Sequence, residues 1–174
     1  MTKNYKILFI DLDGTLIDTL TGKTFPEGVW DMKLNFVLLD CIKKLNPLAV
    51  FIVSNQGGIE KGHIIRRHFN MKIDYITVAV SEYLQCYVNN YYCESNDPNN
   101  RFRKPNPGML EHFLYQVQDT LFKNEGITKD DCLMIGDASG KAGQFSDSDK
   151  MTAVNFGCDY MDVNDFIVEF HKNE

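Results

Sequence analysis

The sequence predicts an α/β protein with a Rossmann-like three-layer α/β/α fold, in which helices cover both faces of a central parallel sheet. Two observations support this fold class. Short, continuously apolar segments alternate along the chain with segments whose apolar residues recur at helical spacing. Three of the apolar segments end in polar, turn-forming residues, as buried strands often do. With 174 residues, the chain is expected to form a single domain over residues 1–174.

Each expected element follows from its own pattern. The apolar run at 5–11 predicts the first strand. Between Leu34 and Leu45, apolar residues recur at helical spacing, which predicts a helix over 32–45 that ends before Pro47. By the same criteria, further strands are expected at 48–53, 75–80, 132–135 and 152–156, further helices at 61–71, 108–123 and 165–171, and a loop at 89–107.

The composition is that of a globular protein, with 44% apolar and 24% charged residues. No apolar run approaches the ~20 residues of a membrane-spanning helix, and the first residues lack the architecture of a signal peptide. The five cysteines are scattered without a Cys-x-x-Cys pair, so reduced thiols are expected. These features lead us to expect a cytoplasmic protein, or a nuclear one if the source is eukaryotic, with no membrane partner.

Polar side chains at the ends of three expected strands predict the functional site. Asp11 and Asp13 follow the first strand, Ser54 follows the second, and Asp137 follows the strand at 132–135. In an open parallel sheet, ligands bind outside the carboxyl ends of the strands. Two carboxylates there are costly unless a cation lies between them, and Mg²⁺ binds one or two carboxylates together with a substrate phosphate. The sequence therefore predicts a Mg²⁺ site at this edge.

Together with Lys104, these side chains provide the groups that phosphoryl transfer needs. A carboxylate can attack phosphorus and form an aspartyl-phosphate. A second carboxyl group can act as acid toward the leaving group and then as base for the attacking water. A metal ion and a lysine can neutralise the phosphate oxygens that would otherwise repel the nucleophile.

In order along the chain, these residues resemble the four motifs of the haloacid dehalogenase (HAD) superfamily. The matching segments are Asp-Leu-Asp-Gly-Thr at 11–15, Ser54, Lys-Pro at 104–105 and Gly-Asp at 136–137. The resemblance implies a HAD-like fold with Asp11 as nucleophile and Asp13 as general acid/base. It implies that Ser54 binds the phosphate and that Lys104 holds both nucleophile and phosphate. It also implies a Mg²⁺ ion bound by Asp11, Asp137 and the main-chain carbonyl of Asp13.

Longer motifs resemble the phosphatase domain of the polynucleotide kinase 3′-phosphatase family. They are Gly22-Lys23-x-Phe25-Pro26, Ser-Asn-Gln-Gly-Gly-Ile at 54–59, Phe-Arg-Lys-Pro at 102–105, Gly-Asp-Ala-Ser-Gly-Lys at 136–141 and Phe-Ser-x-Ser-Asp at 145–149. This resemblance implies removal of a 3′-phosphate from nucleic-acid ends, DNA above all, as in DNA repair. The substrate-binding residues would be Ser54, Asn55, Gln56, Arg103 and Lys104. Asp149 would orient Lys104 without binding the metal, with Asp147 competing for that role.

Several features bear on the substrate. The segments between the motifs leave room for no more than a small lid, so no large cap domain is expected, and an open site suits a large substrate. The sequence contains no Gly-x-x-x-x-Gly-Lys-Ser/Thr loop, so no ATP-dependent kinase activity is expected. The net charge of −6 does not favour nucleic acid over the whole surface. A local basic rim could still bind a DNA end, with candidates His63, Arg66, Arg67, Arg101 and Arg103.

Two other functions fit the same residues. A small-molecule phosphatase of the histidinol-phosphate or heptose-bisphosphate type shares the Ser-Asn-Gln segment. Such relatives carry a Cys/His zinc loop, whereas Cys86 and Cys93 lack the spacing and the nearby histidine to build one. The other alternative is a catalytically silent protein that binds a phosphorylated partner. Tyrosines at near-helical spacing are expected to pack in the fold, or alternatively to stack on bases: Tyr83, Tyr87, Tyr91 and Tyr92.

Overall fold

The computed structural model describes residues 3–23, 26 and 28–171, so Phe25 of the Gly-Lys-x-Phe-Pro motif lies outside the described residues. A parallel five-stranded sheet forms the centre, in the order β5-β4-β1-β6-β7. Its strands are β1 (Ile7–Ile10), β4 (Ala49–Asn55), β5 (Tyr87–Cys93), β6 (Cys132–Gly136) and β7 (Asp159–Asp162). After β1, the chain adds β4 and then β5 on one side of β1. It then crosses back and adds β6 and β7 on the other side of β1. The order therefore reverses at β1, which is where open α/β sheets bind their ligands.

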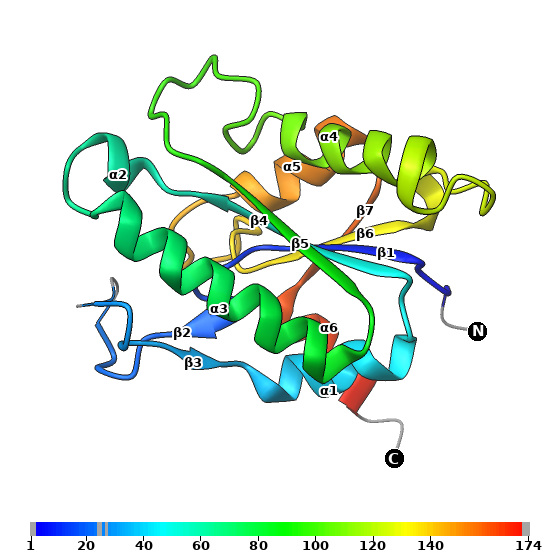
Figure 1. Cartoon of the computed structure of the whole chain (residues 1–174), viewed down its shortest axis with the longest axis horizontal. Helices are drawn as coiled ribbons and strands as arrows, with labels where there is room; N and C mark the ends of the chain where they lie inside the picture. The colour runs from blue at the N-terminus through cyan, green and yellow to red at the C-terminus, as the bar shows by residue number, and fades with distance from the viewer. Residues whose placement is uncertain (1–2, 24–25, 27, 172–174) are drawn as a thin grey trace.

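Helices cover both faces of the sheet (Figure 1). One face is covered by α1 (Phe36–Leu45), α3 (Arg66–Leu84) and α6 (Val163–His171), and the other by α4 (Gly108–Gln116) and α5 (Ser148–Phe156). Successive β1 side chains point to opposite faces, so Leu8 and Ile10 join the first core while Ile7 and Phe9 join the second. The predicted three-layer α/β/α class with a central parallel sheet is confirmed.

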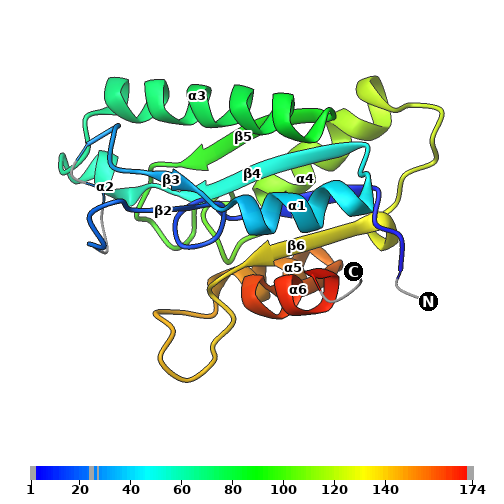
Figure 2. The same cartoon turned by 90° about the horizontal axis from the view of Figure 1, so that it is seen from below.

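The loops that follow the strands meet at one edge of the sheet. Figure 2 shows the carboxyl ends of β4, β5 and β6 at the edge that also carries α2 (Gly57–Glu60) and the loop between β6 and α5. After the first motif the chain forms only a short antiparallel pair, β2 (Ile17–Asp18) with β3 (Lys33–Leu34). No large cap is present among the described residues, as expected, and the edge stays open.

The expected strand at 75–80 is wrong, because this segment belongs to α3. The expected helix at 61–71 begins only at Arg66 and continues to Leu84. Its buried residues Ile73, Ile76, Val80 and Leu84 recur every three or four positions and pack on the sheet. The β-branched residues at 75–80 favour a strand. The buried positions nevertheless recur at helical spacing, and packing of this face on the sheet stabilises the helix.

The expected strand at 152–156 is also wrong. These residues form the last turns of α5, which ends at Gly157 in the left-handed conformation, and the fifth strand is β7. The near-helical spacing of the tyrosines is likewise misleading, since only Tyr83 lies on a helix and the other three lie on β5. The expected loop at 89–107 therefore starts after Cys93.

The remaining expected elements are confirmed with shifted ends. The first helix starts at Phe36, because Lys33–Leu34 pair with β2 and Asn35 caps the helix by accepting from the Leu38 N–H at 3.1 Å. The helix expected at 108–123 is α4 followed by a π-helical turn, Val117–Leu121, and a 3₁₀ turn at Lys129–Asp131 precedes β6. Among the described residues, no helix has the length and apolar character to cross a membrane.

Candidate active site

The turn after β1 brings its two acids to the open edge. The Asp11 N–H donates to the Ile135 carbonyl of β6 at 3.0 Å, and the Gly14 N–H closes a turn onto the Ile17 carbonyl at 2.9 Å. Gly14 has φ +81°, and a β-carbon there would lie 2.3 Å from an Asp137 carboxylate oxygen. Only glycine allows the turn to approach Asp137 this closely.

The ammonium of Lys104 lies at the centre of a buried network. Lys104 Nζ is 2.5 Å from Asp11 Oδ1, 2.7 Å from Asp149 Oδ1 and 3.1 Å from the Val53 carbonyl. These three groups come from the ends of β1, α5 and β4 and accept all three ammonium hydrogens. Lys104 is 4% exposed, so the ion pairs are shielded from solvent. This geometry agrees with the expectation that Lys104 holds the nucleophile.

Asn55 fixes the main chain of the loop that carries Lys104. Its side-chain amide donates to the Lys104 carbonyl at 2.9 Å and accepts from the Lys104 N–H at 2.9 Å. These two hydrogen bonds engage both ends of the Asn55 amide group and hold the main chain of Lys104 in position. Arg103, the other neighbour on this loop, donates to the Ser95 carbonyl at 2.7 Å. Their substrate-binding roles stay predictions.

The charges of the network shift the ionisation of its members. Burial raises the pKa of Asp11 above its ordinary value, and the neighbouring Lys104 ammonium opposes this shift. Burial alone would lower the pKa of Lys104, but the carboxylates of Asp11 and Asp149 raise it instead. Burial, followed by the charge of Asp149, also raises the pKa of Asp137. Burial is thus the main cause of the raised pKa of Asp11 and Asp137, and a cation bound beside them would lower it.

Asp149 uses both carboxylate oxygens within the protein. Oδ1 accepts from Lys104, and Oδ2 accepts from the Ala138 N–H at 3.1 Å. Asp149 is 1% exposed. The side chain of Asp149 thus contacts Lys104 directly, and its orienting role stays a prediction. Asp147, its competitor, precedes α5, and among the described residues the Lys104 ammonium contacts Asp149 instead.

The expected metal ligands fit a divalent cation. Asp11, Asp137 and Asp149 each offer a carboxylate oxygen, and these atoms lie within 4.8 Å of one another. Both carboxylate oxygens of Asp149 already accept hydrogen bonds, one from Lys104 and one from the Ala138 N–H. We therefore expect the carboxylate ligands of a cation to come from Asp11 and Asp137. Asp13 would add its main-chain carbonyl. Such an all-oxygen set suits Mg²⁺ with waters or phosphate oxygens completing the shell.

Asp13 points to the open side of the site. Its side chain is 44% exposed. Gln56 Nε2 donates to Asp13 Oδ2 at 2.7 Å and to Ser54 Oγ at 2.8 Å, which ties the acid to the expected phosphate-binding serine. Ser54 and Gln56 are themselves buried. The structure therefore brings together all of the predicted catalytic side chains, with Gln56 as a bridge.

Two residues near the acids were not assigned a role from the sequence. Thr15, 1% exposed, donates from Oγ1 to Asp11 Oδ2 at 3.4 Å. Lys72 is buried, and its Nζ lies 3.8 Å from Asp13 Oδ1. Thr15 could have been found from its place in the first motif. The signal for Lys72 is its position next to Ile73 on the buried face of α3.

The expected basic rim is partly paired with acids. Arg66 contacts Glu94, and Arg101 lies 3.2 Å from Glu111. His63 and Arg67 are exposed. Tyr91 and Tyr92 pack as expected, Tyr91 against Phe102 at 5.1 Å and Tyr92 against Phe69 at 4.6 Å between ring centroids.

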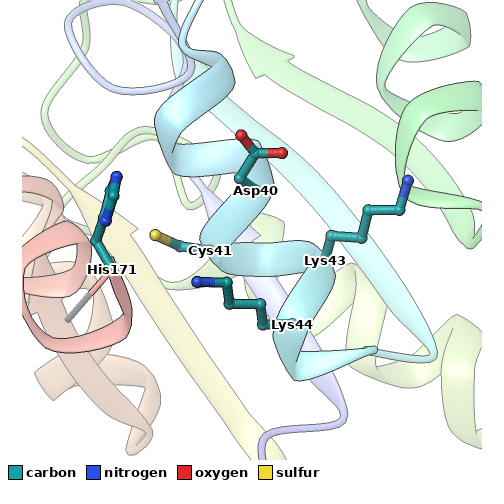
Figure 3. Close-up of a pocket in the computed structure, with 5 residues that line it drawn as sticks. All are labelled: Asp40, Cys41, Lys43, Lys44 and His171. Carbon is teal, nitrogen blue, oxygen red and sulfur yellow. The ribbon is translucent and has the colours of Figure 1, made fainter. Parts of the chain in front are cut away.

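A hollow of about 450 Å³ contains none of the predicted site residues (Figure 3). It lies between α1 and the end of α6 and is lined by Asp40, Cys41, Lys43, Lys44 and His171. Burial raises the pKa of the Cys41 thiol, so the reactive thiolate is disfavoured there. The acids and the lysine expected for phosphoryl transfer lie elsewhere, at the carboxyl edge of the sheet.

Comparison with known proteins identifies the family and the fold of the chain. The family described as polynucleotide kinase 3 phosphatase matches residues 6–167. A bifunctional polynucleotide phosphatase/kinase from Schizosaccharomyces pombe is 30% identical over 173 residues, which is 97% of this chain but 39% of that protein. An uncharacterised 20.8 kDa protein of Autographa californica nuclear polyhedrosis virus is 30% identical over 177 residues, 95% of this chain and 87% of its own. The chain thus spans about two fifths of the length of the yeast relative.

Among solved structures, the fold is similar to that of the D,D-heptose 1.7-bisphosphate phosphatase from B. bronchiseptica, complexed with magnesium and phosphate. The TM-score is 0.66 at 20% identity, over 89% of this chain and 78% of that one. The fold is thus that of HAD-like phosphatases. With its family match running from β1 into α6, the chain belongs to the polynucleotide kinase 3 phosphatase family.

Proposed function

We propose that the protein is a Mg²⁺-dependent phosphatase that removes 3′-phosphate from nucleic-acid ends, DNA above all, through an aspartyl-phosphate at Asp11. The observation that carries the proposal is the position of the Lys104 ammonium, 2.5 Å from Asp11 and 2.7 Å from Asp149. A cation this close to a buried carboxylate can hold that nucleophile and neutralise an incoming phosphate at once.

In the first step, Asp11 attacks phosphorus and the bond between phosphorus and the leaving oxygen breaks. Asp13 gives its proton to that oxygen, which departs as a hydroxyl group. In the second step, Asp13 takes a proton from water as the water oxygen attacks phosphorus, and Asp11 is released as a carboxylate along with inorganic phosphate. The phosphate oxygens would lie near Ser54 Oγ and Lys104.

Asp11, Asp137 and the main-chain carbonyl of Asp13 would hold the Mg²⁺ ion. Bound there, the ion supplies positive charge that favours the ionised form of Asp11 and offsets the charge of the phosphate. The raised pKa values of Asp11 and Asp137 support this assignment, since both acids need such a charge to ionise fully.

The family, together with the open edge beside Asp13, supports a nucleic-acid substrate. Arg103 lies next to Lys104, while His63 and Arg67 are exposed on the segment after Ser54. These groups could contact the phosphodiester backbone without reading sequence. Binding through them should weaken as salt is raised, because counterions are released from the nucleic acid.

A panel of phosphorylated ends tests the proposal. Mg²⁺-dependent release of phosphate is expected from a 3′-phosphorylated DNA oligonucleotide, with little from the same oligonucleotide phosphorylated at its 5′ end. A 3′-phosphorylated RNA, histidinol phosphate and heptose bisphosphate complete the panel. Inertness toward the oligonucleotide at low salt, with turnover of a metabolite, would favour the small-molecule phosphatase. Binding without any turnover would indicate the silent phospho-ligand-binding protein.

A further inference from the structure

Lys72 differs from the other basic residues of its segment. It is 5% exposed, whereas Lys61, His63, Arg66, Arg67 and His68 are exposed. A solvated helix face explains those five but not Lys72. A buried ammonium loses its hydration, and this cost persists unless a partner of opposite charge compensates.

The partner of Lys72 is Asp13, the proposed general acid. Lys72 Nζ lies 3.8 Å from Asp13 Oδ1, and Gln56 donates to Asp13 Oδ2 at 2.7 Å. The Lys72 ammonium thus lies near one oxygen of the Asp13 carboxylate, and the Gln56 amide donates a hydrogen bond to the other oxygen. The Phe69 ring, also on α3, has its centroid 5.4 Å from Lys72 Nζ.

The distance to Asp13 indicates attraction without a direct hydrogen bond, since 3.8 Å exceeds hydrogen-bond range. Within the described part of the chain, Lys72 makes no other ion pair and no hydrogen bond. An apolar side chain of similar length would fill the same space without the desolvation cost, and replacing buried charges in this way is often neutral for stability. The benefit of the charge must therefore lie at Asp13.

We propose that Lys72 is a positioning residue that, with Gln56, holds the Asp13 carboxyl group toward the leaving oxygen. The inference rests on the proposed phosphatase function, in which Asp13 gives its proton to that oxygen as the bond to phosphorus breaks. Lys72 itself exchanges no proton. It acts by limiting the rotation of a side chain that is 44% exposed and would otherwise adopt several orientations.

The test uses the leaving group. An aryl phosphate such as 4-nitrophenyl phosphate expels a stable anion and needs little help from an acid, whereas an alkyl phosphate needs a proton on the departing oxygen. The parameter kcat/KM reports the steps up to departure of the leaving group, so it isolates this function of Asp13. Glycerol 2-phosphate supplies an uncharged alkyl leaving group, and a 3′-phosphorylated oligonucleotide supplies an alkyl leaving group beside a phosphodiester.

For Lys72→Met, we expect kcat/KM to fall about tenfold or more for both alkyl substrates and less than about threefold for the aryl phosphate. General acid–base catalysis contributes roughly 10²–10⁴-fold in all, which bounds the loss. Lys72→Arg retains the charge and should recover most of the loss. The matched control is Lys43→Met, which makes the same change at an exposed lysine of α1 and should leave all three values unchanged.

Three outcomes would overturn the proposal. Equal losses for all substrates would mean a general structural role, and a loss confined to the oligonucleotide would mean that Lys72 binds the phosphodiester. No loss at all would mean that the charge is dispensable. The proposed function can fail separately: if the wild-type protein does not cleave the oligonucleotide, the comparison of glycerol and aryl phosphates still tests Lys72.

Discussion

Asp11 and Asp13 lie two positions apart at the end of the same strand, yet their surroundings differ. Asp11 is buried with Lys104, which also contacts Asp149, and this side of the site forms a closed ionic network. Asp13 is 44% exposed, and among the described residues its carboxylate contacts Gln56 and Lys72. A nucleophile must be fixed against phosphorus, whereas an acid/base must reach both a departing alcohol and an arriving water. The environment of each carboxyl group thus suits it to one of the two roles.

The largest effect is expected on the closed side, for Asp11→Asn. Removing the proposed nucleophile should lower kcat by about 10⁴-fold or more, because the amide of asparagine is a much weaker nucleophile than a carboxylate. Lys104 keeps Asp149 as an ion-pair partner in this variant, so the loss of stability should be smaller than that for Lys104→Met. Phosphate-release kinetics and thermal melting measure the two effects. Undiminished turnover would overturn the assignment of the nucleophile.

Lys104→Met is expected to affect both activity and stability. It leaves the Asp11 and Asp149 carboxylates buried without a cation, which should lower the free energy of unfolding by about 3 kcal/mol. Turnover should fall by at least about 10²-fold, as when a charge-stabilising group is removed from an active site. Urea denaturation and steady-state kinetics provide the measurements. The double variant Lys104→Met with Asp149→Asn should regain stability but not activity, and recovery of both would count against the role of Lys104.

A smaller effect is expected on the open side, for Gln56→Leu. The substitution removes one of the two groups that hold Asp13 and frees the Ser54 hydroxyl. We expect kcat/KM for a 3′-phosphorylated oligonucleotide to fall about tenfold, well short of the loss for Asp11→Asn. The exposed Gln118→Leu is the matched control. A loss as large as that for Asp11→Asn would contradict the proposed difference between the buried Asp11 side and the open Asp13 side of the site.

The pKa of the buried Asp162 is shifted downward, opposite to the pKa of Asp11. Burial would raise its pKa, but hydrogen bonds from Gln144 at 2.7 Å and Ser139 at 2.9 Å help to lower it below its ordinary value. Its contribution to stability is thus fully present above the unfolded-state pKa of about 3.9 and is lost as pH falls through the lower folded-state value.

We therefore expect Asp162→Asn to lower the free energy of unfolding by about 2 kcal/mol at pH 7, with the difference from wild type shrinking as the pH is taken below about 4. Urea denaturation at both pH values measures it. The exposed Asp165→Asn should show a smaller loss at pH 7. A difference for Asp162→Asn that is constant with pH would contradict the account.

The fold and most of the site could be predicted because the site residues follow continuous apolar strands. Asp11, Ser54 and Asp137 lie where β1, β4 and β6 end, and the parallel sheet brings these ends together. The errors arose where local composition and tertiary packing disagree. The β-branched residues at 75–80 lie on a helix because its buried face packs on the sheet. The contact of Lys72 with Asp13 depends on how α3 docks over the edge of the sheet, which no local pattern encodes.

The stereochemistry of hydrolysis tests the central claim most directly. A 3′-phosphorothioate oligonucleotide, made chiral with oxygen isotopes, would be hydrolysed in labelled water and the configuration of the released thiophosphate determined. Attack by Asp11 followed by attack by water makes two in-line displacements, and each inverts the phosphorus. The account predicts net retention of configuration. Net inversion would mean that water attacks the substrate directly and would contradict the role of Asp11 as nucleophile.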